Sequence, residues 1–551
     1  MAMYDISGWL WLAALAPLAI IFYLLTGRQW KVSKAAPVGY LLASLIGIVV
    51  FGASLYMIFL LTLKGIWQAV TILYVVVPAL LLYLVAREAG TFDVLRRGIA
   101  EYTPNNLLHV LAFGWVFSSF LQGVTGFGVP ALVTAPLLVA MGVKPLWAVA
   151  ITLIGHAWAC TFGTLAVAWE GLTAVTDMQN PGGTAAITAF MLLLVNYING
   201  FIIAWFFGRW QAIREALPAV LIIGSIQGLG QLFLASRTPE LSNLLPGTVA
   251  LGAVLLLAKS RWYSKPTAIT DSQVMQPSAL GGQAHESKEK PPEAAGDAKK
   301  RQMGLGLAML PYAVLIALIL GVRLIPVLQE TFSAVQFGFS FPRLETSRGF
   351  VIEAVAAYRP FRPLTHAGTF LLLSALVTFV AFRRRGDIHP GGMASILGQT
   401  AKTSLPAAIA FLTLLPLTKA MEGSGQTVVL AMGIANFAPP LVYAFMASVV
   451  GVLGSFMTSS NLSSNILFGS LQESTASTLG LSQEVILAAQ TAGAAVGNAF
   501  APGNVLMAAT ATGIQEKTGA IIRLTTGYVL LAGGLVGLLA VLGAWFALGG
   551  P

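Results

Sequence analysis

The sequence predicts an all-α polytopic membrane protein, with about 12 full transmembrane helices and two broken or re-entrant hairpins arranged in two inverted repeats. Three observations lead to this fold class. Of the 551 residues, 57% are hydrophobic and only 9% are charged, whereas roughly a quarter of the residues in soluble domains are charged. Apolar runs long enough to cross a bilayer recur along the chain. One sequence pattern also occurs twice, each time just before a polar interruption of an apolar stretch.

The composition excludes several classes of protein. Cys160 is the single cysteine and the five histidines are scattered, so we expect neither a disulfide nor a metal site. The net charge of +10 lies largely in short loops, where membrane topology explains it, so we expect the lipid bilayer as a partner and no nucleic acid. We expect no cofactor and no enzymatic activity. A membrane-embedded enzyme is a remote alternative, which would need a nucleophile–base pair or metal ligands near one membrane face.

The predicted crossings are apolar runs close to the about 20 residues that span a bilayer. They lie at about 8–26, 37–62, 66–86, 146–168, 185–207, 213–236, 242–259, 304–327, 365–382, 401–421, 483–510 and 525–549. Two further apolar stretches, 105–142 and 440–480, are too long for one crossing, and each contains a break rich in Gly, Ser or Asn. These two stretches predict the broken hairpins.

Loop charges predict the orientation, because cytoplasmic loops collect Lys and Arg. The first loop carries Arg28, Lys31 and Lys34, which places it in the cytoplasm. Alternation of the crossings then leaves both chain termini outside.

Composition divides the chain into two halves and a linker. The N-terminal half, 1–259, contains the first hairpin, and the C-terminal half, 304–551, contains the second. Residues 260–303 are rich in Ser, Gln, Pro, Lys and Glu, and we predict that they form a disordered cytoplasmic linker. The outside loop at about 329–365 is long, so we expect an extracellular helix or a segment that dips back into the protein.

An internal repeat relates the two halves. The pattern GxxxVLxxGIAxxxP begins at Gly90 and again at Gly425. Further matched pairs are Gly142/Gly480, Ala150/Ala488, Gly155/Gly493, Ala157/Ala495 and Phe162/Phe500. The first copy carries Arg96 and Arg97, whereas the second has no Lys or Arg from residue 423 to residue 482. This asymmetry predicts inverted copies, an arrangement typical of secondary transporters with a substrate site at the interface of the repeats.

The two breaks are the candidate binding site. Irregular backbone at membrane depth is stable only when it is buried in protein or lines a wet cavity, so matching breaks indicate a central aqueous site. A half-helix that starts at such a break offers free N–H groups and a partial positive charge, which favour a carboxylate. The candidate residues are Gln122, Thr125, Gly126, Phe127, Gly128, Ser459, Ser460, Asn461, Ser463, Ser464, Asn465 and Asn498. The alternative is that the small residues only allow close helix packing.

Two titratable residues are candidates for proton coupling. His156 follows the first break, and imidazole titrates in the useful range, although a hydrogen-bonded packing histidine explains it equally well. Glu353 lies in the outside loop, where it and Arg359 could instead form a structural ion pair or gate. Thr161, Thr164, Gln490 and Asn504 also follow the breaks.

At these segments the chain resembles the L-lactate permease family of bacterial inner-membrane transporters. The resemblance lies in GTFDVLRRGIAEYTP, LQGVTGFGVPA, PLLVAMGVKPLWA, SSNILFGSLQ and AAQTAGAAVGNAFAP, and it covers nearly the whole chain except the linker. It implies a bacterial inner-membrane carrier that imports a small organic anion, a 2-hydroxymonocarboxylate such as L-lactate or glycolate, by proton symport.

The chain departs from the family's pattern at three positions. Gln122 stands where the resemblance implies an acidic residue, Asn461 where it implies Asp, and Asn498 where it implies Lys. The alternatives are therefore a sodium-coupled or uncoupled carrier, or one for a dicarboxylate or a sulfonate. The sequence is also compatible with a homo-oligomer.

Overall fold

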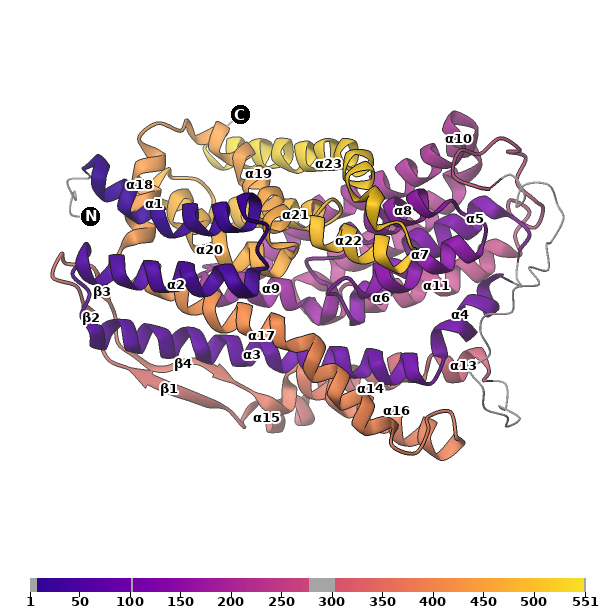
Figure 1. The fold of residues 1–551 in the computed structure, drawn as a ribbon, viewed down its shortest axis with the longest axis horizontal. Helices are drawn as coiled ribbons and strands as arrows, with labels where there is room; N and C mark the ends of the chain where they lie inside the picture. Colours follow the sequence, from indigo (N-terminus) through magenta and orange to yellow (C-terminus); the bar gives the residue numbers. More distant parts are fainter. Residues whose placement is uncertain (1–6, 101–102, 277–302, 550–551) are drawn as a thin grey trace.

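The computed structural model describes residues 7–100, 103–276 and 303–549, and helices pack side by side in an elongated bundle (Figure 1). Among these residues, 11 helices are long and apolar enough to cross a membrane, or up to 12 if a bent helix pair is counted as one span. The bent pair is Leu310–Leu324 and Pro326–Ser333, which meet at 89°. The prediction of a polytopic helical protein with about 12 spans is confirmed.

The N-terminal half is entirely helical in its described part. Its elements are α1 Gly8–Phe22, η1 Tyr23–Gly27, α2 Val32–Val49, α3 Leu55–Glu88, α4 Thr91–Ala100, α5 Asn106–Leu111, η2 Ala112–Phe117, α6 Ser118–Val124, α7 Val129–Ala140, α8 Pro145–Ala157, α9 Gly163–Val175, α10 Pro181–Ala235, η3 Pro239–Leu241 and α11 Leu244–Ala258. Polar side chains cap several starts: the side chains of Ser54, Asn105 and Asn180 accept backbone N–H groups of the first turns of α3, α5 and α10. The long α10 is two helices joined at a kink, where Gly208 and Arg209 leave helical geometry.

The C-terminal half adds short strands to its helices. Its elements are α13 Leu305–Ala308, α14 Leu310–Leu324, α15 Pro326–Ser333, β1 Phe337–Phe341, β2 Leu344–Glu345, β3 Val351–Ile352, β4 Val355–Phe361, η4 Pro363–Thr365, α16 Ala367–Arg385, α17 Gly392–Ser424, α18 Gln426–Ala435, α19 Pro440–Thr458, α20 Asn461–Thr478, α21 Gln483–Gly497, α22 Pro502–Ala511, η5 Gln515–Lys517 and α23 Thr518–Ala547.

Both predicted hairpins are broken where the sequence placed the breaks. The helical run α5–η2–α6 ends at Val124 and α7 begins at Val129, while α19 ends at Thr458 and α20 begins at Asn461. In the order of elements, α4 to α9 resemble α18 to α22, since each series runs through a short helix, a broken hairpin and a second interrupted pair. An inversion between the two copies stays a prediction.

Four of the predicted crossings have different bounds in the structure. The runs 37–62 and 66–86 are in fact α2 and α3, which are separated by a turn where Gly52 has a φ of +70° and Ser54 caps α3. The runs 146–168 and 483–510 are each two helices, α8 with α9 and α21 with α22. These interruptions contain mostly apolar or small residues, so hydropathy does not mark them.

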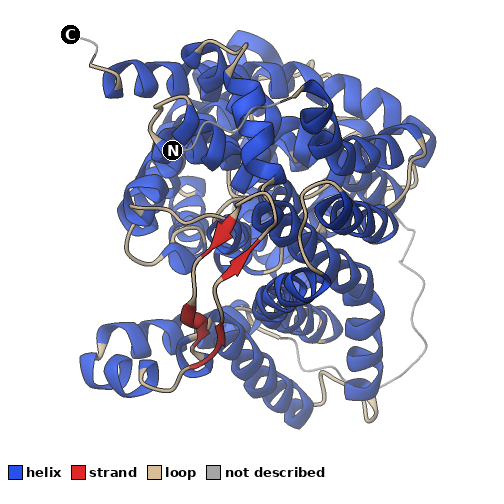
Figure 2. Ribbon diagram, turned by 90° about the vertical axis from the view of Figure 1, so that its left-hand side faces the viewer, coloured by secondary structure: helices blue, strands red, loops and turns tan. Residues whose placement is uncertain are grey.

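The outside loop differs from the all-helical expectation. It contains α15 and two short antiparallel sheets, in which β1 pairs with β4 and β2 pairs with β3 (Figure 2). Phenylalanines alternate with Gly338 and Ser340 in β1, and aromatic residues favour extended strands. The Trp67 indole N–H donates to the backbone oxygen of Arg359 at 3.2 Å, which fixes β4 against α3.

The predicted linker lies mostly outside the described residues, because 277–302 are not described. Its beginning packs onto the N-terminal half: the Tyr263 hydroxyl donates to the Glu215 carbonyl at 2.9 Å, and Met275 forms an antiparallel bridge with Val143. Residues 260–276 are therefore part of the packed structure.

Candidate functional site

A cavity of about 1110 Å³ lies between the tips of the two broken hairpins. It is lined by residues of both halves, including the break after α6, the break after α19, the start of α22 and the middle of α17. The loop that joins α1 to α2 also lines it, from Thr26 to Ser33. We call this space the central cavity.

The structure brings eight of the predicted site residues together at the central cavity. They are Gln122, Phe127, Gly128, Ser459, Ser460, Asn461, Ser463 and Asn498. The other four do not line it. Thr125 and Ser464 donate to the carbonyls of Leu121 and Gly451, Gly126 packs against Thr164, and Asn465 is buried among helices.

The first tip depends on glycine. Gly126, Phe127 and Gly128 have φ values of 56°, 51° and 79°, in the left-handed region that glycine tolerates and most residues avoid. A Cβ on Gly126 would lie 2.1 Å from the Thr164 hydroxyl oxygen, and one on Gly128 would lie 2.3 Å from the Met507 methyl group. The chain can therefore turn back here only with little side-chain bulk, and the turn aims the start of α7 at the cavity.

The second tip is held by serine hydroxyls. Ser459 has a φ of 55°, and Ser460 caps α20 by accepting the Ser463 backbone N–H at 3.2 Å. The Ser459 hydroxyl accepts the backbone N–H of Gly503 at 2.9 Å, which ties this tip to the first turn of α22. The second tip and α22 thus form one wall of the cavity.

Three helices start at the central cavity. The cap of α7, the cap and first residues of α20, and the first residues of α22 line it. The first N–H groups of a helix lack intrahelical acceptors and carry a partial positive charge. Lys31, at the loop between α1 and α2, is the one charged side chain among the described lining residues. The cavity therefore favours a small anion through backbone dipoles and contains no carboxylate that would repel it.

Side-chain amides join the two halves behind the tips. Asn461 Nδ2 donates to the Thr161 hydroxyl at 3.1 Å, and Asn465 Nδ2 donates to the Ala168 carbonyl at 2.9 Å. The Thr161 hydroxyl in turn donates to the Thr491 carbonyl at 3.1 Å. Within the described residues, the amide oxygens of Asn461 and Asn465 are buried without a hydrogen-bond donor. Of the two oxygens, only that of Asn461 belongs to a residue that lines the cavity.

Several lining residues were not among the predicted site residues. Cys160 and Asn504 form a chain with Asn498, whose Nδ2 donates to the Cys160 sulfur at 3.1 Å and whose Oδ1 accepts from Asn504 Nδ2 at 2.6 Å. Thr164 and Met507 also line the cavity. Thr164 and Asn504 follow the breaks in sequence, which is the only signal that could have found them, whereas nothing in the sequence distinguishes Cys160 or Met507.

The two coupling candidates lie away from the central cavity. His156 is buried in α8, where its Nδ1 donates to the Thr152 carbonyl at 2.6 Å. Glu353 has a side chain that is 80% exposed and lies 3.9 Å from Arg343. It forms no pair with Arg359, which pairs with Asp177 at 3.1 Å, so the expected Glu353–Arg359 ion pair is wrong.

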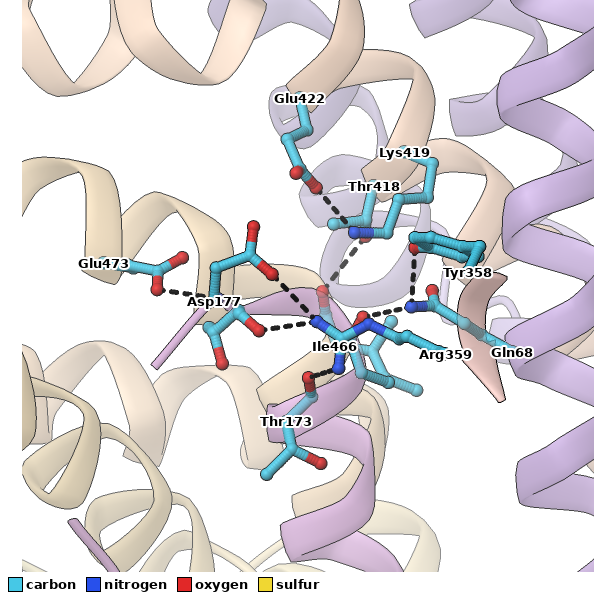
Figure 3. Close-up of polar contacts among 12 residues, drawn as sticks. Gln68, Thr173, Asp177, Tyr358, Arg359, Thr418, Lys419, Glu422, Ile466 and Glu473 are labelled. Carbon is cyan, nitrogen blue, oxygen red and sulfur yellow. Dashed lines mark hydrogen bonds and ion pairs between the residues drawn. The ribbon is translucent and has the colours of Figure 1, made fainter. Parts of the chain in front are cut away.

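A second, smaller cavity of about 580 Å³ lies beside the strands, and we call it the vestibule. Figure 3 shows its polar contacts, which the sequence did not predict. The Arg359 guanidinium donates to the carbonyls of Thr173 and Thr176 at the end of α9 and to Asp177 (Figure 3). Lys419 is paired with Glu422 at 2.8 Å. Gln68 of α3 donates to the Tyr358 hydroxyl at 2.8 Å, so α3, α9 and β4 are joined here.

The two cavities lie along the same helix. Thr164, Val167 and Ala168 of α9 line the central cavity, whereas Thr173 and Thr176 line the vestibule. Ala168 and Thr173 are five positions apart in the helix, which corresponds to about 7.5 Å along its axis. We call residues 168–173 of α9, which separate the two cavities, the partition. It is packed tightly, because a Cβ on Gly171 would lie 2.1 Å from the Leu462 methyl group of α20.

Comparisons with known proteins agree with a membrane carrier. A family described as L-lactate permease matches residues 11–546. The chain is 26% identical to the glycolate permease GlcA of Escherichia coli (strain K12), over 97% of this chain and 95% of that protein. It is 27% identical to the L-lactate permease of the same strain, over 98% of each, and 26% identical to the L-lactate permease of Halalkalibacterium halodurans, over 97% and 95%. Among solved structures it is similar to the YdaH transporter of Alcanivorax borkumensis, with 16% identity, a TM-score of 0.45 and coverage of 89% and 88%.

Proposed function

The chain belongs to the L-lactate permease family and is a multi-pass bacterial inner-membrane protein, and from this we propose that it is a secondary transporter that imports a 2-hydroxymonocarboxylate by proton symport. L-Lactate and glycolate are the candidate substrates, since relatives along the whole chain are named as permeases for these two acids. The observation that carries the proposal is the central cavity with three helix starts in its wall.

A monocarboxylate fits this wall better than a dicarboxylate does. Its single carboxylate would be attracted by the partial positive charge at the starts of α7, α20 and α22. A second carboxylate would need a second positive group, and among the described lining residues only Lys31 is charged. Apolar surface from Phe127, Leu462 and Met507 is suited to a short hydrocarbon body.

The 2-hydroxyl group of the substrate also has a partner. Asn461 lines the cavity, and its buried amide oxygen lacks a donor. A substrate hydroxyl placed at this tip would donate to that oxygen and remove an unsatisfied acceptor, which is worth about 1–3 kcal/mol. An acid without the hydroxyl would leave the oxygen unsatisfied.

Sodium coupling is the second candidate mechanism, and one observation favours it. The oxygens of Asn461 and Asn465 are both without donors and are four residues apart, on one face of α20. Amide and carbonyl oxygens beside an unwound helix tip are the ligands that coordinate Na⁺ in other carriers. Proton symport remains our proposal because the family resemblance implies it.

The conformation is consistent with alternating access. The central cavity reaches the loop from Thr26 to Ser33, which the Lys and Arg residues of that loop predict to be cytoplasmic. The vestibule adjoins the strands, which belong to a loop predicted to be outside. We propose that the partition between Ala168 and Thr173 opens as the cavity closes toward the cytoplasm.

Uptake by proteoliposomes tests the function. Vesicles of purified protein are given labelled L-lactate or glycolate, with an inside-alkaline pH gradient or an inward sodium gradient imposed separately. We expect saturable uptake and counterflow of both acids, driven by the pH gradient and abolished by a protonophore. Acetate and succinate serve as substrates without the 2-hydroxyl and with a second carboxylate, and we expect at least about 5-fold lower kcat/KM for each.

Two results would contradict the proposal in different ways. Uptake driven only by sodium would replace the proton as coupling ion and would keep the substrate. Absence of counterflow for every acid, in protein that is folded by a thermal unfolding assay, would remove the carrier function itself.

A further inference from the structure

Lys64 is a buried cation that no carboxylate of the described residues contacts. Lys64 is 4% exposed and lies in the apolar helix α3. No hydrogen bond or ion pair joins its ammonium group to another described residue. The ammonium lies over the rings of Phe341 and Tyr358, whose centroids are 5.0 and 5.1 Å from Nζ. Burying a charge without a contacting counter-ion is costly, so an anion bound beside Lys64 would stabilise its ammonium group.

The other charges of the vestibule already have partners. Asp177 pairs with Arg359 at 3.1 Å and Glu422 pairs with Lys419 at 2.8 Å. The third carboxylate in the lining, Glu353, lies 3.9 Å from Arg343. Lys64 is therefore the one charged side chain among the described lining residues that has no salt-bridge partner.

We propose that the vestibule is a first binding site for the transported acid, in which Lys64 binds the carboxylate of one small monocarboxylate before it reaches the central cavity. The inference deepens the proposed function and rests on it for the identity of the acid. It assigns a role to a residue far in sequence from both hairpin tips.

The geometry supports a carboxylate with a short apolar body. The Tyr358 hydroxyl lines the vestibule and accepts from Gln68, so its own hydrogen is free to be donated to a ligand oxygen. Leu61, Ile352 and Val355 give the cavity apolar surface beside the two rings. An ammonium, a hydroxyl donor and apolar walls are the usual elements of a small organic-acid site.

Position explains why such a site would help transport. The vestibule wall at Thr173 is separated by about 7.5 Å of α9 from the central cavity wall at Ala168. An acid bound at Lys64 is therefore next to the partition when it opens. A positive group in a narrow cleft also raises the local concentration of an anion and its rate of association.

Protection from chemical labelling tests the site without any mutation. Wild-type protein in proteoliposomes is treated with an acetylating succinimidyl ester, and acetylation of Lys64 and Lys402 is followed by peptide mass spectrometry. We expect L-lactate, glycolate and acetate to slow acetylation of Lys64 at least about 5-fold, with no change at the exposed Lys402. Chloride at the same ionic strength should not protect. Equal protection by chloride, or no protection by any carboxylate, would overturn the proposal.

Transport kinetics distinguish a substrate-binding role of Lys64 from a purely structural role. For Lys64→Gln we expect the KM for uptake from the strand-bearing side to rise about 10-fold, with kcat changed less than 2-fold, because a charged hydrogen bond is lost only in the loading step. Lys64→Arg keeps the charge and should recover most of the affinity. The matched control is Arg362→Gln, which removes an exposed cation of the same segment outside the lining and should change KM less than 2-fold.

The outcomes distinguish this site from the function on which it rests. A fall in kcat with unchanged KM in Lys64→Gln would show a structural role and would overturn the site. If no acid is transported but carboxylates still protect Lys64, the carrier proposal fails and the binding site stands.

Discussion

Asn498 donates its side-chain amide to the sulfur of Cys160 at 3.1 Å, and the two residues occupy equivalent places in the repeated pattern. The matched pairs Gly155/Gly493 and Phe162/Phe500 have the same separation of 338 residues as Cys160 and Asn498. A two-fold axis between inverted copies passes close to any residue that touches its own equivalent. The contact therefore suits a two-fold relation between the copies with its axis beside the central cavity, and the inversion of the copies stays a prediction.

This contact predicts a cross-link. Because Cys160 is the only cysteine, Asn498→Cys would create one pair across the two halves. We expect mild oxidation to remove both free thiols and to stop uptake, and a reductant to restore both. Thiol titration under denaturing conditions measures the number of free thiols. The control is Asn436→Cys, at an exposed position. Thiols that stay free under oxidation would contradict the close approach.

Gly126→Ala is expected to abolish transport. The new Cβ would lie 2.1 Å from the Thr164 hydroxyl, and the backbone φ of 56° adds about 1–2 kcal/mol of strain for a residue with a side chain. The tip should therefore move, with a lower unfolding temperature and at least about 10-fold slower uptake. Gly252→Ala is the control, since no atom lies within 4 Å of its added Cβ. Normal uptake by Gly126→Ala would show that the tip is not rigid.

Arg359→Gln should loosen the end of α9. The guanidinium donates to the carbonyls of Thr173 and Thr176, and loss of such bonds costs about 1–3 kcal/mol locally. We expect amide hydrogen exchange in the last turn of α9 to become about 10-fold faster. Arg362→Gln, which removes one 3.3 Å bond to Gln336, should leave that peptide unchanged. Equal exchange in both variants would show that Arg359 does not stabilise the end of α9.

The Lys419–Glu422 pair should show an asymmetric loss of stability. The Lys419 side chain is 7% exposed and that of Glu422 is 38% exposed. Glu422→Gln leaves a buried ammonium unpaired, so it should lower the free energy of unfolding more than Lys419→Met does. In a double-mutant cycle we expect a coupling on the order of 1–3 kcal/mol. Zero coupling, or the reverse order of the single variants, would be inconsistent with a buried pair.

His156→Gln should retain pH-driven uptake. His156 lines neither cavity, and its Nδ1 bond to the Thr152 carbonyl can be made by a glutamine amide. We expect uptake with an unchanged dependence on the imposed pH gradient, measured beside Glu353→Gln as the other titratable candidate. Uptake that loses its pH drive while counterflow persists would instead identify His156 as the proton carrier.

The sequence predicts the hairpins because their breaks are polar or glycine-rich inside long apolar stretches. Gly126 and Gly128, and the serines before Asn461, are visible without a structure. The break between α8 and α9 is not visible, because residues 158–160 continue the apolar run. Its left-handed turn at Thr164, Leu165 and Ala166 is held by tertiary packing.

The vestibule could not be predicted for a related reason. Lys64 falls in the gap between the predicted crossings 37–62 and 66–86, so the charge itself indicates a loop. The structure instead buries it within α3, where Phe341 and Tyr358 from a distant strand segment cover it. Long-range contacts of this kind leave no periodicity in the sequence around Lys64.

The starts of α7, α20 and α22 attract an anion with peptide dipoles, and peptide dipoles have no pKa. Acidification of one compartment cannot switch off this attraction, in contrast to an imidazole or an amine. The strength with which the central cavity holds its solute should therefore be the same on the acidic and the alkaline side of the membrane. A measured pH effect would then report either the ionisation of the solute or the movement of a coupled proton.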